Sequence, residues 1–122
     1  MKGLLFVLAL GVGITGAASA RAQDAAAGES FFKRACAACH TVEAGKNRVG
    51  PSLAGVSGRK AGQVDGFAYS AALKEAGVEW TDENLDKYLA DPRAFLPGNK
   101  MAYAGAKKEA DRANLIAFLK TK

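Results

Sequence analysis

Residues 34–40 of the chain read RACAACH, and this stretch determines what the rest of the protein has to fold around. Cys36 and Cys39 are separated by two residues, and His40, the only histidine in the sequence, follows the second cysteine directly. A Cys-x-x-Cys pair occurs in redox dithiols and in zinc sites, and Cys-x-x-Cys-His occurs where haem is attached covalently. Each of these chemistries makes a different demand on the remaining sequence.

The first 22 residues differ from the remainder of the 122-residue chain. Lys2 is followed by an uncharged apolar run over residues 3–14, and then by small residues with A-x-A patterns at 18–20 and 20–22. This layout is typical of a secretory signal peptide, and the apolar run is shorter than the roughly twenty residues that span a bilayer. We expect residues 1–22 to be a cleavable signal peptide, cut after Ala22 or after Ala20, with an uncleaved anchor as the alternative. Residues 23–122 are expected to form one domain.

Helix signals recur along residues 23–122, whereas the alternating apolar patterns that indicate strands are nearly absent. Asp24, Ser70 and Thr81 are suitable N-cap residues. An irregular stretch is expected after Asp91-Pro92, because proline disfavours helical backbone in the residue before it. The predicted class is all-α, with three to five short helices joined by long loops, and the helices cover about residues 24–35, 70–76, 81–90 and 108–120.

Two features indicate close packing around a bound group. Gly28 lies inside the first predicted helix, where glycine costs up to about 1 kcal/mol relative to alanine, and a close helix crossing would explain it. Residues 41–67 are glycine-rich and irregular, and a structureless loop of this length is uncommon in a compact domain and usually functional. The apolar residues of this loop need a surface to pack on, and a cofactor would supply one.

Two interpretations of the cysteine pair fail on context. A thioredoxin-like dithiol needs β-α-β surroundings, and no strand is predicted near Cys36. A structural zinc site usually needs four Cys or His ligands, and Cys36, Cys39 and His40 exhaust the supply outside the signal peptide. Haem attachment accounts for every position, because the two thiols add to the two haem vinyl groups and the adjacent histidine reaches the iron. We therefore predict one covalently bound haem c, held by Cys36 and Cys39, with His40 as an axial ligand.

The second axial ligand determines the reactivity of such a site. An open or water-bound position would allow a peroxidase or a gas-binding protein, whereas a second strong protein ligand leaves electron transfer. Met101 is the only methionine after the predicted signal peptide, and it lies in the Gly/Pro-rich segment LPGNKMAYAG. A thioether is soft, favours ferrous iron and raises the reduction potential. An isolated methionine is more often a core residue, but this loop context favours Met101 as the ligand.

At this point the sequence resembles a known family, the class I cytochromes c, of the bacterial type closest to mitochondrial cytochrome c. The resemblance covers the chain from about Gly28 to Lys120. It rests on four blocks: CAACHTVE (36–43), GPSLAGVSGRKAGQVDGFAYS (50–70), EWTDENLDKYLADPRAFLPGNKMAYAG (79–105) and LIAFLK (115–120).

The resemblance implies the cytochrome c fold wrapped around one haem, and a role for each matching residue. The Pro51 carbonyl would accept a hydrogen bond from His40, and Tyr88 would lie near the Met101 sulfur. Arg59, Tyr69 and Trp80 would hold the haem propionates. Three positions depart from the mitochondrial pattern: Leu73 in place of an asparagine, Asn99 in place of a threonine near the methionine, and Tyr103 in place of a phenylalanine at the haem edge.

The resemblance further implies a soluble electron carrier rather than an enzyme, and the predicted signal peptide implies export to the periplasm. It would shuttle electrons between membrane complexes, such as a cytochrome bc complex and a terminal oxidase or a photosynthetic reaction centre. Without Lys2 and Arg21 of the predicted signal peptide the net charge would be about +3, which lacks the basic excess of a nucleic-acid binder. The protein is expected to be a monomer without membrane insertion. Partners would dock transiently on a lysine-lined haem edge formed by Lys33, Lys46, Lys100, Lys107 and Lys108.

Overall fold

The computed structural model describes residues 11, 13 and 23–122, and the predicted signal peptide therefore lies almost entirely outside the described residues. Within the described part, the fold is helical, with long irregular connections and a single isolated β-bridge between Lys60 and Glu79. None of the helices in this part is both long and apolar enough to cross a membrane. The elements in chain order are α1 (Ala25–Ala35), α2 (Ala71–Glu75), α3 (Asp82–Ala90), α4 (Pro92–Phe95) and α5 (Glu109–Leu119).

Side-chain caps begin the helices where the sequence predicts them. The Asp24 carboxylate accepts hydrogen bonds from the backbone N–H groups of Ala26 and Ala27, at 2.9 and 3.1 Å. The hydroxyls of Ser70 and Thr81 accept in the same way from residues three positions further on. Such caps satisfy backbone donors that have no partner within the helix.

The stretch after Asp91 is only partly irregular, which corrects the sequence-based expectation. Pro92–Phe95 form the additional short helix α4. Asp91 closes α3 by donating its N–H to the Lys87 carbonyl, and its side chain accepts from the N–H of Ala94 at 3.2 Å. Proline at the first helical position loses no hydrogen bond and has a backbone angle suited to a helix. Asp91-Pro92 therefore both ends one helix and starts the next.

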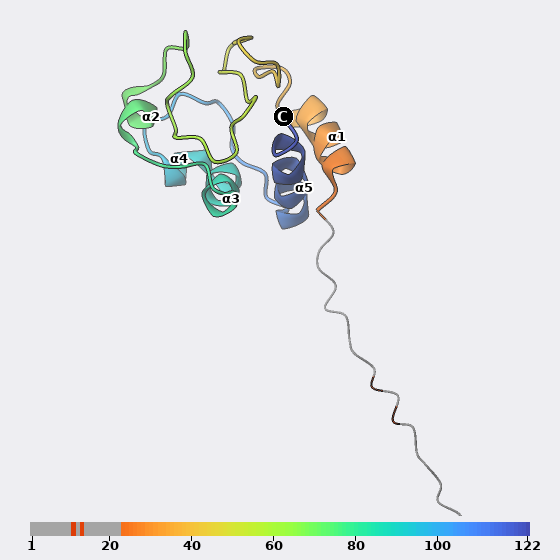
Figure 1. Cartoon of the computed structure of the whole chain (residues 1–122). Coiled ribbons are helices and arrows are strands. Elements are labelled where there is room, and N and C mark those ends of the chain that lie inside the picture. Colours follow the sequence, from red (N-terminus) through yellow and green to blue (C-terminus); the bar gives the residue numbers. More distant parts are fainter. Residues whose placement is uncertain (1–10, 12, 14–22) are drawn as a thin grey trace, which may run out of the picture.

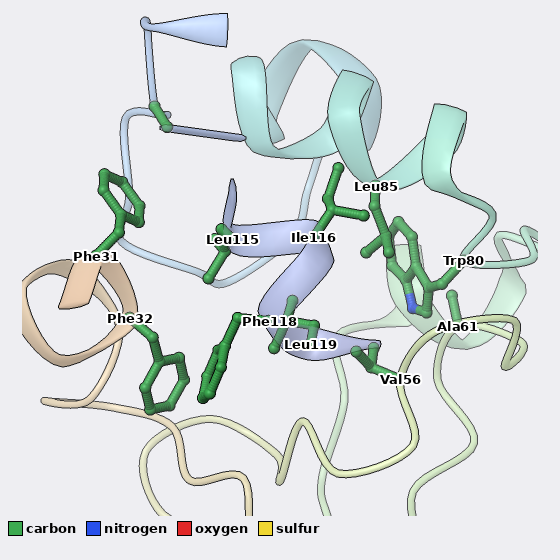
Figure 2. Close-up of a cluster of buried hydrophobic side chains, with 11 residues drawn as sticks. Phe31, Phe32, Val56, Ala61, Trp80, Leu85, Leu115, Ile116, Phe118 and Leu119 are labelled. Carbon is green, nitrogen blue, oxygen red and sulfur yellow. The ribbon is translucent and has the colours of Figure 1, made fainter. Parts of the chain in front are cut away.

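Helix α5 lies between α1 on one side and α3 on the other (Figures 1 and 2). The α1–α5 crossing is closest at Gly28, where an added Cβ would collide with the backbone carbonyl of Asn114 and come within 2.9 Å of the Phe118 Cβ. Figure 2 shows Phe32 directed from α1 toward Phe118 of α5, and the ring centroids of this pair lie 5.6 Å apart. The close crossing expected from Gly28 is thus confirmed.

The apolar side predicted for the last helix forms the centre of the hydrophobic core. Leu115, Ile116, Phe118 and Leu119 are all buried, and Leu115 is only 1% exposed. Trp80 and Leu85 complete the core on the other side of α5 (Figure 2).

The long loop over residues 41–67 has little regular structure but is fastened by hydrogen bonds to distant segments. Its backbone N–H groups at Gly58 and Ala61 donate to the carbonyls of Trp80 and Val78, each at 2.8 Å. The Leu53 N–H donates to the Thr41 carbonyl at 2.8 Å. These bonds hold the loop beside the helical core and leave a hollow between them.

Candidate haem site

One cavity collects the residues that the sequence marks as a haem site. It has a volume of about 370 Å³, within the range of cofactor sites, and its lining is predominantly apolar. Its walls come from the end of α1, the 41–67 loop, α3, the connection between α4 and α5, and α5 itself. All nine predicted site residues line this cavity: Cys36, Cys39, His40, Pro51, Arg59, Tyr69, Trp80, Tyr88 and Met101.

The two thiols and the imidazole are placed by the turn that ends α1. The N–H groups of Cys39 and His40 both donate to the Cys36 carbonyl, at 3.1 and 3.0 Å. Both cysteines are free, with Cys36 half-buried and Cys39 exposed. Burial, with a smaller contribution from Cys39, raises the pKa of the Cys36 thiol to about 11. The motif thus presents two unpaired thiols on one side of the cavity.

His40 is held in one tautomer and one orientation. Its Nδ1 lies 2.7 Å from the Pro51 carbonyl oxygen, and because a carbonyl can only accept, Nδ1 carries the proton. The other ring nitrogen, Nε2, therefore keeps its lone pair, which is the state that a metal ligand requires. Burial lowers the pKa of His40, and the hydrogen bond to Pro51 opposes this shift. The neutral imidazole is thus the favoured form.

Gly50 is a site residue that the sequence does not mark as functional. An added Cβ at this position would collide with the His40 ring, so only glycine leaves room for the imidazole. Its N–H also donates to the Cys39 carbonyl at 2.8 Å, which ties the loop to the cysteine motif. The glycine next to Pro51 is the only sequence signal that could have pointed to this role.

Met101 reaches the same cavity from the connection between α4 and α5. Its sulfur lies 3.8 Å from the Tyr88 hydroxyl, which donates to it. Its backbone N–H donates to the Asn99 side chain at 3.0 Å. Burial raises the pKa of Tyr88 to about 12, so the phenol keeps its proton at neutral pH. The thioether therefore lines the same cavity as His40, the one imidazole that the described residues contain.

Tyr88 is part of a cluster of aromatic side chains that stiffens this wall. Its ring centroid lies 4.9 Å from that of Trp80 and 6.2 Å from that of Phe95. Tilted and edge-to-face arrangements of this kind are favourable for aromatic pairs.

Arg59 and Tyr69 both line the cavity and have hydrogen-bonding capacity that the described residues do not use. The Arg59 Nη1 donates to the Ala54 carbonyl at 2.8 Å, whereas its Nε is buried without a partner among the described residues. The Tyr69 oxygen accepts from the Val64 N–H at 3.1 Å, which leaves its own proton free to donate. An unpaired buried guanidinium nitrogen is costly unless an acceptor is bound, and a carboxylate is the acceptor that suits it best.

Two of the three residues that depart from the mitochondrial pattern, Leu73 and Tyr103, line the cavity. The pKa of Tyr103 is raised by burial and, to a smaller extent, by the charges of Cys36 and Asp111. The third, Asn99, accepts the hydrogen bond from the Met101 backbone N–H.

Of the five lysines predicted at the haem edge, only Lys100 lines the cavity. The others include Lys33 and Lys46, paired with Glu29 and Glu43, and Lys107, which donates to the Ala90 and Ala104 carbonyls.

These residues fit a covalently attached haem. Two free thiols, a neutral imidazole and a soft thioether border one apolar cavity, and Arg59 on its wall has a buried Nε without an acceptor among the described residues. No group of three His, Cys, Asp or Glu side chains within the described ranges is arranged to hold a metal ion directly. A mostly helical fold with these features defines a c-type haem protein with two protein-derived axial ligand candidates.

The comparisons with known proteins agree with this class. The cytochrome c family model matches residues 25–122. Cytochrome c2 of Blastochloris viridis is 50% identical over 117 residues, which cover 95% of this chain and 87% of the relative. Cytochrome c of Arabidopsis thaliana is 50% identical over 97 residues, covering 79% of this chain and 87% of the relative. The solved structure of cytochrome cH from Methylobacterium extorquens superimposes with a TM-score of 0.76 at 48% identity, covering 81% of this chain and 99% of that one.

The chain therefore belongs to the cytochrome c family, and the resemblance to both bacterial and mitochondrial types is confirmed. It has the class I cytochrome c fold and is an electron carrier with covalently attached haem c.

Proposed function

We propose that this carrier works in the bacterial periplasm without catalysing a reaction of its own. It would shuttle electrons between membrane redox complexes, such as a cytochrome bc complex and a terminal oxidase or a photosynthetic reaction centre. The observation that carries the proposal is that His40 and Met101 border the same cavity as the two thiols. Both side chains would then ligate the iron, which would leave no coordination position for a substrate.

The proposal assigns a role to each side of the cavity. Cys36 and Cys39 would hold the haem through two thioether bonds, and His40, whose ring is held by the Pro51 carbonyl, would ligate the iron. Met101 would ligate the iron from the other side, with its sulfur oriented by the Tyr88 hydroxyl. Bound haem supplies an iron that alternates between Fe(II) and Fe(III). Because the two ligands are held by hydrogen bonds that do not involve the iron, little has to rearrange when the charge changes.

The polar groups on the cavity wall suit the haem propionates. Arg59 offers its buried Nε–H, Tyr69 offers its hydroxyl proton, and Trp80 contributes an indole N–H from a largely buried position. A charged guanidinium next to a carboxylate forms a strong, charge-assisted hydrogen bond.

Docking would use the mouth of the cavity, where Lys100 is exposed. A lysine at this position attracts an acidic surface on a partner and gives fast, weak and salt-sensitive association. Lys33, Lys46, Lys107 and Lys108 would extend the basic surface.

Spectroscopy of the purified holoprotein tests the ligand assignment. A Met–Fe(III) charge-transfer band in the near infrared, with no binding of carbon monoxide by the reduced protein, supports an electron carrier. Ready carbon monoxide binding would instead indicate a displaceable sixth ligand and a gas-binding or peroxidase function.

Turnover with membranes from the source organism tests the partners. We expect one membrane complex to reduce the protein and another to oxidise it, with rates that fall as ionic strength rises. Lys100→Gln should slow these reactions at low salt. Lys87→Gln is the matched control, because Lys87 lies on α3 in an exposed pair with Glu83 and does not line the cavity. Equal rates for the two variants, or rates indifferent to salt, would contradict docking at this mouth.

Periplasmic location depends on the predicted signal peptide. Mass spectrometry of the exported protein should find a chain beginning at Gln23, or at Arg21 if cleavage follows Ala20. An intact N-terminus retained with the membrane would support the anchor instead.

A further inference from the structure

Asn99 ends a tight turn that directly precedes Met101. The turn is Leu96-Pro97-Gly98-Asn99, in which the Asn99 N–H donates to the Leu96 carbonyl at 3.2 Å. Gly98 has a φ of +87°, and proline followed by glycine at the two central positions is the pattern of a type II turn. The turn brings the Asn99 side chain back toward the end of α4.

Every polar group of the Asn99 side chain is used. Its Nδ2 donates to the carbonyls of Pro92 and Leu96, both at 2.8 Å. Its Oδ1 accepts the Met101 N–H at 3.0 Å. The orientation of the amide is unambiguous, because the carbonyls can only accept and the N–H can only donate.

These three bonds join two segments that no regular structure connects. Pro92 is buried and belongs to α4, whereas Met101 lies in the connection to α5. The Tyr88 hydroxyl donates to the Met101 sulfur, and the Asn99 side chain accepts from the Met101 backbone N–H, so Met101 is held both at its sulfur and at its backbone. A flexible thioether on a non-helical segment depends on such fastening to stay in one place.

We propose that Asn99 is a positioning residue that keeps Met101 on the iron, and so determines how easily an outside ligand displaces the thioether. The inference rests on the proposed function, in which Met101 is the distal ligand. A threonine here would have one hydroxyl, with one donor, and could not reproduce two donated bonds and one accepted bond together. The asparagine thus gives this chain a more firmly held distal ligand than a threonine would.

Imidazole titration of the oxidised holoprotein measures this displacement directly. Asn99→Ala loses all three hydrogen bonds. We expect imidazole to bind about tenfold more tightly, which corresponds to the net free energy of about one hydrogen bond. Asn99→Thr restores one bond, so its affinity should lie between those of Asn99→Ala and the unaltered protein. The near-infrared methionine band should weaken in the same order.

Asn47, in the separate loop over residues 41–67, offers a matched control. Its side chain makes the same kind of link, accepting from the Ser52 N–H at 2.9 Å and donating to the Asp65 carbonyl at 3.1 Å. Asn47→Ala should lower the midpoint of unfolding without changing the imidazole affinity.

Two results would overturn the inference. One is an imidazole affinity of Asn99→Ala equal to that of the unaltered protein. The other is an equal rise in affinity for Asn47→Ala, which would reduce the effect to general destabilisation. A missing methionine band in the unaltered protein would instead refute Met101 as the ligand. That result would contradict the proposed function, and it is distinguishable because it is measured on the unaltered protein and not on the variants.

Discussion

The substitution Gly28→Ala tests the helix crossing at the centre of the fold. The added Cβ would overlap the backbone carbonyl of Asn114 and approach the Phe118 Cβ to 2.9 Å. The carbonyl cannot rotate aside as a flexible side chain can, so α1 and α5 have to move apart. This movement loosens the contact between Phe32 and Phe118 and the packing around Leu115.

Two opposing effects set the magnitude. Alanine is a better helix former than glycine by about 1 kcal/mol, which taken alone would stabilise the variant. Overpacking of a core costs about 1–3 kcal/mol, and the rigid obstacle at Gly28 places this site at the upper end. The net effect is a loss of about 2 kcal/mol, which corresponds to a fall in melting temperature of about 10 °C for a domain of this size.

Guanidinium unfolding of the oxidised holoprotein, followed by far-ultraviolet circular dichroism, provides the measurement. The pair Ser30→Gly and Ser30→Ala is the control, because Ser30 lies on the exposed face of the same helix and has no partner in α5. The difference between these two variants measures helix propensity alone. If Gly28→Ala is more stable than the unaltered protein by about that difference, the reasoning from the close crossing is refuted.

Three further predictions follow from single contacts. Asp24→Ala removes the cap on two N–H groups and should lower the free energy of unfolding by about 1 kcal/mol, whereas an unchanged denaturation midpoint would contradict the cap. Gly50→Ala pushes on the His40 ring and should lower the stability of the holoprotein by about 2 kcal/mol and shift its haem absorption spectrum, and an unaltered spectrum and midpoint would contradict the contact. Tyr88→Phe removes the hydroxyl that draws electron density from the Met101 sulfur, so redox titration should find a potential lower by roughly 20–60 mV, and an equal or higher potential would contradict that role.

The regular elements were largely predictable because their signals are local. Asp24, Ser70 and Thr81 cap helices that begin where the sequence indicates, since a cap and its partners lie within three residues of each other. Helix α4 was missed although Asp91 followed by proline is a recognised start signal. The same pair also ends α3, and the prediction took account only of this helix end and not of the helix start.

The chemistry of the site was also predictable, because covalent haem attachment needs its groups close together in the chain. Cys36, Cys39 and His40 lie within five consecutive positions, and the scarcity of other ligands makes Met101 the predicted second ligand. Residues 41–67 were predicted to be irregular and to need a surface, and the loop indeed lines the cavity. Its path was not predictable, because it depends on hydrogen bonds to Val78 and Trp80.

The sequence by itself determined the cofactor and the fold class and predicted where the cofactor is attached, since these depend on residue identity and short-range spacing. Tertiary structure alone decided which side chains support His40 and Met101. Gly50 matters because the His40 ring occupies the space next to it, and Asn99 matters because a turn places its amide among three backbone groups. Such roles arise from hydrogen-bond direction and steric contact in three dimensions, which the order of residues does not reveal.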